Sequence, residues 1–113
     1  MRVNATRVQL MNDEQVARRM GTYRLAALPG DGTGREVMRE ALRVLSVFEE
    51  NSPLSFEIKE IPCGGQYYLE TGEEWPAGSF EYCRDESDAI LLGAIGWPDA
   101  RLPNGDMAGG QTI

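Results

Sequence analysis

One stretch sets the architecture of the chain: Tyr23-Arg-Leu-Ala-Ala-Leu-Pro-Gly-Asp-Gly-Thr-Gly-Arg-Glu-Val-Met-Arg-Glu-Ala-Leu-Arg-Val-Leu45. Its apolar run from Arg24 to Leu28 ends at a proline and a glycine, a pattern typical of a central parallel strand with both faces covered. The turn Gly30-Asp-Gly-Thr-Gly34 follows, and its three glycines tolerate a positive φ. The stretch therefore predicts a buried strand, a tight turn and a helix in immediate succession.

The helix is predicted to begin at Thr33. Thr33 and Glu36 are three residues apart, which is the spacing of a capping box, in which each side chain accepts a hydrogen bond from the other residue's amide. Behind them, apolar residues recur at steps of three and four. They form one stripe that is expected to pack on a sheet: Val37, Met38, Ala41, Leu42, Leu45 and Phe48.

Four more elements are expected further along the chain. The first is a half-exposed strand near a sheet edge at Leu54–Ile61, and the second is a helical turn at Gln66–Thr71 closed by Gly72. A helix follows Trp75-Pro76, with Ala77, Phe80 and Cys83 on its inner face. The last is a buried strand at Ala89–Ile95. This order predicts an α/β fold, an open parallel sheet of about three strands with flanking helices. The last strand would have an unpaired edge, and no core pattern follows it from residue 100 to 113.

Length and charge limit the classes of protein that fit. The 113 residues are expected to form one partial α/β domain at 23–113, preceded by an extension at 1–22 that is poorly ordered or a short helix. The net charge is −7, and because residues 1–22 carry +2, the remainder carries −9. An acidic surface repels phosphate backbones, so we expect no nucleic-acid partner. No apolar run approaches the roughly 20 residues that span a bilayer, so we expect no membrane partner either.

Cys63 and Cys83 are the two cysteines, and the sequence contains no histidine. Without a Cys-x-x-Cys pair or a histidine ligand, no zinc site is expected. We expect two reduced core thiols in a cytoplasmic protein, because nothing nearby in sequence would activate either thiol as a nucleophile. The acidic pairs are expected on solvated surfaces: Glu49-Glu50, Glu73-Glu74 and Asp85-Glu86.

The glycine turn does not fit the known phosphate-binding fingerprints. A Gly-x-Gly-x-x-Gly pattern would place a glycine at Arg35 or at Val37, and no lysine follows as a Walker loop requires. The carboxylate of Asp31 would also repel a phosphate. Two interpretations stay open: a structural tight turn with Asp31 bonded to local amides, or a ligand-binding loop.

A second candidate loop, Gly93-Ala-Ile-Gly-Trp-Pro-Asp99, follows the last predicted strand. Open parallel sheets bind ligands at the carboxyl ends of their strands. Trp97 either stacks on a planar ring of a ligand or covers the open edge of the sheet. Asp99, Asn104 and Asp106 lack the ligand spacing of a calcium-binding loop, so we expect no metal here.

Three segments follow one another along the chain: Leu28-Pro-Gly-Asp-Gly-Thr-Gly-Arg-Glu-Val-Met38, then Gly64-Gly65, then Ser87-Asp-Ala-Ile-Leu-Leu-Gly-Ala-Ile-Gly96. Together they resemble a known family, the isocitrate and isopropylmalate dehydrogenases, which are β-decarboxylating dehydrogenases. In order and spacing they resemble the amino-terminal part of that family, from about Tyr23 to Asp99. The sequence Gly96-Trp-Pro-Asp99 looks more like the tartrate and D-malate members.

The resemblance implies oxidation of a 2-hydroxy acid by NAD, followed by loss of a β-carboxylate with help from Mg²⁺ or Mn²⁺. It implies dinucleotide contacts at five positions of this sequence: Thr33, Gly96, Trp97, Pro98 and Asp99. Thr33 replaces the usual isoleucine and so loses apolar contact with an adenine. Arg35 replaces the usual proline.

The family's catalytic and metal-binding groups match no position in this sequence. The resemblance therefore implies an amino-terminal fragment that is inactive alone, cut from an enzyme that is expected to be a homodimer. One alternative is a truncated, non-catalytic module that pairs through its open sheet edge with a full-length relative. The other is a small flavodoxin-like nucleotide or phosphate binder, against which the failed fingerprint and Asp31 argue. Whether the cofactor is NAD or NADP, and which hydroxy acid is the substrate, stay open.

Overall fold

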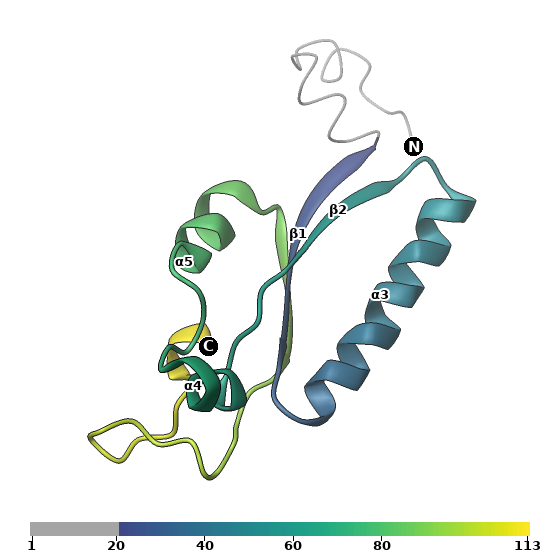
Figure 1. Ribbon diagram of the computed structural model, residues 1–113. Coiled ribbons are helices and arrows are strands. Elements are labelled where there is room, and N and C mark those ends of the chain that lie inside the picture. Colours follow the sequence, from purple (N-terminus) through teal and green to yellow (C-terminus); the bar gives the residue numbers. More distant parts are fainter. Residues whose placement is uncertain (1–20) are drawn as a thin grey trace, which may run out of the picture.

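A three-stranded parallel sheet organises the chain, and its central strand is the one predicted from the first apolar run. The computed structural model describes residues 21–113, so almost all of the expected extension lies outside the described residues. Strand β1 (Thr22–Gly30) pairs with β2 (Ser55–Glu60) on one side and with β3 (Ala89–Ala94) on the other. The sheet order is β2-β1-β3 (Figure 1). The α/β class and the parallel crossovers are therefore confirmed.

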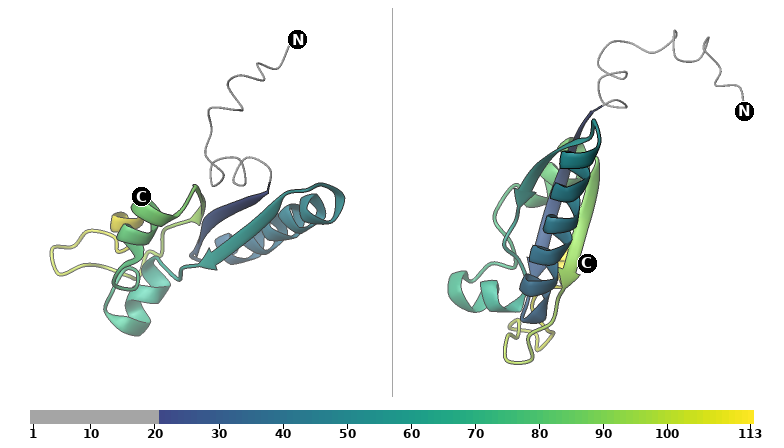
Figure 2. Two further views of the ribbon diagram at one scale, coloured as in Figure 1. Left: turned by 90° about the horizontal axis from the view of Figure 1, so that it is seen from above. Right: turned by 90° about the vertical axis from the view of Figure 1, so that its right-hand side faces the viewer.

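Helices cover both faces of β1. The long helix α3 (Thr33–Asn51) runs along one face, whereas α4 (Gly65–Thr71) and α5 (Ser79–Glu81) lie on the other side (Figures 1 and 2). A π-helix, Tyr82–Glu86, continues α5, and a short 3-10 turn, Gly110–Thr112, ends the chain. Because β1 has a neighbour on each side and helices above and below, its residues 25–28 are all buried. No helix in this described part is long and apolar enough to cross a membrane.

The core forms between β1 and the segments after β2. Ala26 and Leu28 pack with Ile61 and Cys63, and Trp75, Tyr82, Cys83 and Ile95 close the cluster as partly buried neighbours. Cys63 is 2% exposed and both thiols are free. Cys63 is therefore a core thiol as predicted, and Cys83 packs against the margin of the core. The reduced state of both thiols stays a prediction.

The start of α3 differs from the predicted capping box. The N-cap residue is Gly32 rather than Thr33, and no side chain caps the first turn. Gly32 has φ 52° and ψ −120°, a backbone conformation that is open to glycine and closed to threonine. The helix therefore begins one residue earlier than a Thr33 cap would place it, and Thr33 is already its first residue.

The apolar stripe of α3 is only partly covered by the sheet. Met38 is buried at 4% exposure and the side chains of Ala41, Leu42 and Leu45 are half-buried. Val37 and Phe48, which lie on the same margin of the stripe, are 62% and 53% exposed. A single helix on a narrow sheet buries the centre of its stripe, and here it leaves this one margin in solvent.

Strand β3 was predicted to be buried, and this is wrong for its side chains at Ile90 and Leu92, which are 50% and 47% exposed. Exposed and half-buried residues alternate along the strand, so Ile90 and Leu92 share one face of the sheet, and this face is largely uncovered at β3. The inner face predicted for the second helix is also wrong. Phe80 is 52% exposed, and Ala77 precedes α5 and is exposed.

Two shorter predictions have opposite outcomes. The helical turn before Gly72 is confirmed as α4, and Gly72 ends it with φ 80° and a 2.8 Å bond from its N–H to the Tyr68 carbonyl. The segment after residue 99 was expected to lack core residues. Instead Ala100, Ala108 and Thr112 are buried, because the chain folds back through an antiparallel bridge between Arg101 and Met107.

Candidate functional site

The candidate site is built around Asp31, whose side chain is buried at 3% exposure. Its carboxylate accepts three backbone hydrogen bonds: Oδ2 from Gly65 at 2.9 Å and from Gly96 at 2.9 Å, and Oδ1 from Gln66 at 2.8 Å. The expectation that Asp31 bonds to local amides is wrong, since its partners lie 34 to 65 residues away along the chain. The turn itself is tied to β3, because the Asp31 N–H donates to the Ala94 carbonyl at 2.7 Å.

Asp31 serves as a cap for a distant helix. The first amides of a helix lack intrahelical partners, and Gly65 and Gln66 are the first two residues of α4. No side chain from its own N-cap residue serves them, so the Asp31 carboxylate fills that place. Gly64 has φ 103°, and a Cβ atom there would lie 2.7 Å from Asp31 Oδ2. Glycine is therefore required where the carboxylate sits.

Gln66 returns a hydrogen bond to the glycine turn. Its Oε1 accepts from the Gly32 amide at 2.9 Å, while its own amide donates to Asp31. The two segments thus exchange side-chain bonds in the manner of a capping box, although they are 34 residues apart in sequence. This exchange fixes the peptide between Asp31 and Gly32, one residue before Thr33.

Trp97 lies against the same cluster. A Cβ atom on Gly65 would come within 2.7 Å of Trp97 Cβ, and one on Gly32 would lie 3.6 Å from Trp97 Cζ3. The half-buried tryptophan therefore packs over the start of α4 and beside the glycine turn. Whether the Trp97 ring stacks on a ligand or only covers the edge of the sheet stays a prediction, since packing against one segment does not exclude stacking on a ligand.

The predicted cofactor residues come from two loops that the structure brings together. The glycine turn follows β1 and the Gly96 loop follows β3, and parallel strands end at the same edge of a sheet. Thr33, Pro98 and Asp99 are exposed there, and Gly96 and Trp97 are half-buried. The dinucleotide contacts of these five residues stay a prediction.

Sequence reasoning missed two residues of this cluster, Gly65 and Gln66, as members of the site. The pair Gly64-Gly65 was visible as a motif, and it marks the place where the carboxylate and Trp97 approach the backbone. Gln66 carried no signal, because its bond to Gly32 joins residues 34 apart along the chain and no local pattern marks it.

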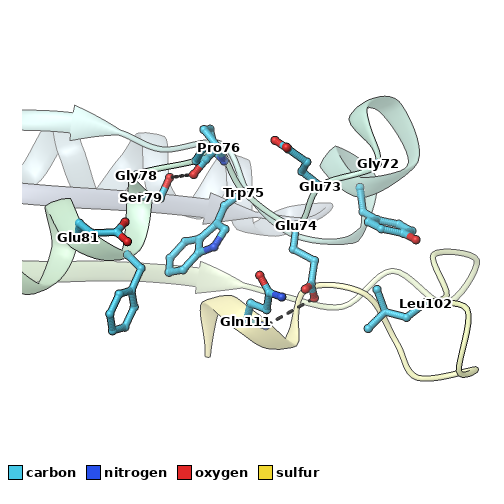
Figure 3. A pocket seen from close by; sticks show the side chains of 13 residues that line it. Gly72, Glu73, Glu74, Trp75, Pro76, Gly78, Ser79, Glu81, Leu102 and Gln111 are labelled. Carbon is cyan, nitrogen blue, oxygen red and sulfur yellow. Dashed lines mark hydrogen bonds between the residues drawn. The ribbon is translucent and has the colours of Figure 1, made fainter.

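A second buried carboxylate lies beside a different pocket. Glu74 is 6% exposed, so its prediction as a solvated residue is wrong. Its Oε1 accepts from the amide of Gly109 at 2.5 Å and from that of Gln111 at 3.5 Å. Figure 3 shows Glu74 directed toward Gln111, and Glu73 directed away, in a pocket of about 560 Å³ that Trp75 also lines. Glu74 thus holds the last turn of the chain in place.

Titration at the thiols follows from burial. Desolvation raises the pKa of the Cys63 thiol above its ordinary value of 9.0, with a contribution from the nearby Asp31 carboxylate, and a backbone bond to Gly30 opposes the rise. Desolvation also raises the pKa of Cys83, against the opposing charge of Lys59.

Within residues 21–113, no group of three or more cysteine or acidic side chains is arranged to hold a metal ion.

The fold and the loop cluster define an α/β domain with its candidate site at the carboxyl ends of parallel strands. A family model described as isocitrate/isopropylmalate dehydrogenase matches residues 24–108. The chain therefore belongs to the isocitrate/isopropylmalate dehydrogenase family.

Relatives and a solved structure agree with this assignment. The chain is 47% identical over 74 residues to the 3-isopropylmalate dehydrogenase of Buchnera aphidicola subsp. Uroleucon obscurum, covering 66% of this chain and 20% of the relative. It is 44% identical over 79 residues to that of Aquifex aeolicus, covering 70% and 21%. A crystal structure of a β-decarboxylating dehydrogenase from Thermococcus kodakarensis in its apo form is similar with a TM-score of 0.53 and 38% identity, covering 72% and 23%.

The chain spans about a fifth of the length of the curated relatives it matches. The relatives described above are named 3-isopropylmalate dehydrogenases. The closer likeness of Gly96-Trp-Pro-Asp99 to tartrate and D-malate dehydrogenases remains a prediction.

Proposed function

We propose that this chain supplies part of the dinucleotide-binding surface of a β-decarboxylating dehydrogenase that uses NAD and Mg²⁺ or Mn²⁺. The substrate would be a 2-hydroxy acid of the isopropylmalate, tartrate, malate or isocitrate class. One observation carries the proposal: Asp31 joins the glycine turn to the Gly96 loop, and these loops carry the five residues predicted to contact NAD. A cytoplasmic location is part of the proposal, in keeping with two free thiols.

The chemistry divides between this chain and the rest of such an enzyme. The hydroxyl-bearing carbon gives a hydride to NAD, the hydroxyl proton leaves, and the β-carboxylate departs as CO₂. A divalent metal, when bound, polarises the new carbonyl and stabilises the enolate. The described residues contain no cluster fit to hold that metal. We therefore assign binding and orientation of the dinucleotide to this chain, and expect the 113 residues alone to be inactive.

A segment exchange tests the proposal. The matched segment of the Aquifex aeolicus 3-isopropylmalate dehydrogenase is replaced by residues 24–108 of this chain, and NAD reduction is measured with 3-isopropylmalate, tartrate, D-malate and isocitrate in the presence of Mg²⁺. We expect turnover on at least one of these acids and an altered KM for NAD, because Thr33 lies on the proposed contact surface. A folded dimeric hybrid that oxidises none of the four acids would refute the proposal.

A second candidate function is that of a non-catalytic module that pairs with a full-length relative. The supporting observation is the edge strand β3, where Ile90 and Leu92 are half-exposed. Unpaired strand edges with apolar side chains recruit further strands. Co-expression with a full-length relative, followed by size-exclusion chromatography, would give a complex of fixed stoichiometry if this function holds. Separate elution of the two proteins would count against it.

A further inference from the structure

We infer that Gln66 is a positioning residue for the proposed dinucleotide surface, acting through the peptide between Asp31 and Gly32. The inference rests on the proposed function. It adds to the five predicted contact residues one that no sequence motif marks. The carrying observation is the 2.9 Å hydrogen bond from the Gly32 amide to Gln66 Oε1.

The Gly32 peptide needs an outside partner to hold it. Gly32 is the N-cap of α3, so its N–H lies outside the helical hydrogen-bond pattern. Glycine in this conformation has no Cβ to restrict it, and φ 52° with ψ −120° is one of many accessible backbone states. Gln66 Oε1 therefore selects the orientation of the peptide between Asp31 and Gly32, one residue before Thr33.

The backbone of Gln66 is itself held in place. Its backbone amide donates to Asp31 Oδ1 at 2.8 Å, and the preceding residue, Gly65, is packed under Trp97. The side chain of Gln66 thus links the turn that carries Thr33 to the same segment on which Trp97 rests. The start of α4 therefore holds both of the proposed contact loops, the glycine turn and the Gly96 loop, in position.

The side-chain bond is separable from the fold. Asp31 is held by the backbone amide of Gln66, which any residue other than proline provides. Gln66 is half-buried and is not part of the hydrophobic cluster, so removing its amide group opens no core cavity. A change of side chain should therefore release Gly32 while Asp31 keeps its three partners.

The test compares three variants of the full 113-residue chain, labelled with ¹⁵N and titrated with NAD. Gln66→Leu removes the acceptor, and Gln66→Asn keeps an amide that is one methylene too short to reach Gly32. Gln111→Leu makes the same chemical change at an exposed glutamine whose side chain makes no hydrogen bond within residues 21–113, where only its backbone N–H is bonded. The Thr33 amide and the Trp97 indole N–H report binding, and amide hydrogen exchange at Gly32 reports its release.

We expect Gln66→Leu and Gln66→Asn to bind NAD about three- to tenfold more weakly than the unaltered chain, the loss that one neutral hydrogen bond provides. Exchange at Gly32 should accelerate in both, with unchanged far-UV circular dichroism, and Gln111→Leu should match the unaltered chain. Equal NAD affinities for the unaltered chain and both Gln66 variants would overturn the inference alone. An unaltered chain without any NAD-dependent shift would overturn the proposed function and this inference together.

Discussion

Asp31 and Gly96 are 65 residues apart, and the Asp31 carboxylate accepts a 2.9 Å hydrogen bond from the Gly96 amide. The same oxygen, Oδ2, also accepts from Gly65. One buried carboxylate therefore ties the end of β1 to the loop after β3 and to the start of α4. Hydrogen bonds to a charged group are stronger than neutral ones, so this residue holds the candidate site together.

Replacing Asp31 by asparagine should destabilise the fold strongly. The amide group of Asn presents NH₂ where Oδ1 or Oδ2 now accepts, so at least one of the amides of Gly65, Gln66 and Gly96 would face a donor. Loss of charge-assisted bonds in a buried place costs on the order of 3 kcal/mol in the free energy of unfolding. Urea denaturation followed by circular dichroism measures the change.

Asp85→Asn is the matched control for this variant. Asp85 is an exposed aspartate whose carboxylate pairs with Arg84 on the surface. Exposed ion pairs contribute little, so its urea midpoint should stay close to that of the unaltered chain. Equal midpoints for the two variants would show that Asp31 does not hold the loops.

Gly65→Ala should also destabilise the chain, through crowding. An added Cβ atom would meet Trp97 Cβ at 2.7 Å and Ala100 Cβ at 2.9 Å, and both distances are shorter than van der Waals contact. Overpacking of this kind costs about 1–3 kcal/mol. The thermal midpoint and the fluorescence of Trp97 should both change, since the indole has to move away from α4.

Gly110→Ala separates crowding from the general effect of replacing a glycine. A Cβ atom on Gly110 would meet nothing within 4 Å. Its midpoint should therefore match that of the unaltered chain. A midpoint for Gly65→Ala as high as that of Gly110→Ala would refute the packing of Trp97 on Gly65.

The sequence predicts interactions between residues that are close along the chain, and it does not predict those between residues that are far apart along it. The run from Arg24 to Leu28 predicts a central strand, because its apolar residues and the glycines after it are neighbours in sequence. The partners of Asp31 are not neighbours, and a carboxylate in a glycine turn fits local bonding equally well. Glu74 shows the same limit, since its amide partners at Gly109 and Gln111 lie 35 and 37 residues further on.

The burial of the β3 side chains could not be predicted from the sequence either. The apolar pattern of Ala89–Ile95 correctly predicts a parallel strand, yet it cannot say how many neighbours the strand has. In the described part of the chain β3 pairs with β1 alone. The pattern also cannot say which face is covered: Ile90 and Leu92 lie on the same, largely uncovered face and are exposed, although their pattern is that of an enclosed strand.

The two thiols should differ in reactivity toward a thiol reagent in the native state. The thiolate is the reacting form, and burial raises the pKa of Cys63 and of Cys83 above 9.0, so both should react more slowly at pH 8 than a free exposed thiol. Cys63 is 2% exposed, whereas Cys83 is half-buried. Labelling followed by mass spectrometry should therefore find Cys83 modified first, and the rates of both should rise as the pH approaches 9 and above.

Cys83→Ser provides the control, because it leaves Cys63 as the single thiol. That variant should label slowly at pH 8 and at the rate of a free thiol once it is unfolded in urea. Fast labelling of the folded variant would contradict the burial of Cys63.

The edge of β3 should govern self-association of the isolated chain. Leu92 is 47% exposed on a strand edge, and a lysine there places a charge beside the unpaired backbone, which opposes addition of another strand. Leu92→Lys should lower the fraction of dimer and larger species in light scattering after size-exclusion chromatography. Val44→Lys changes the net charge equally on α3, at a residue that is 56% exposed, and should leave the fraction unchanged. If Val44→Lys reduces association as much as Leu92→Lys does, charge or the helix rather than the strand edge drives it.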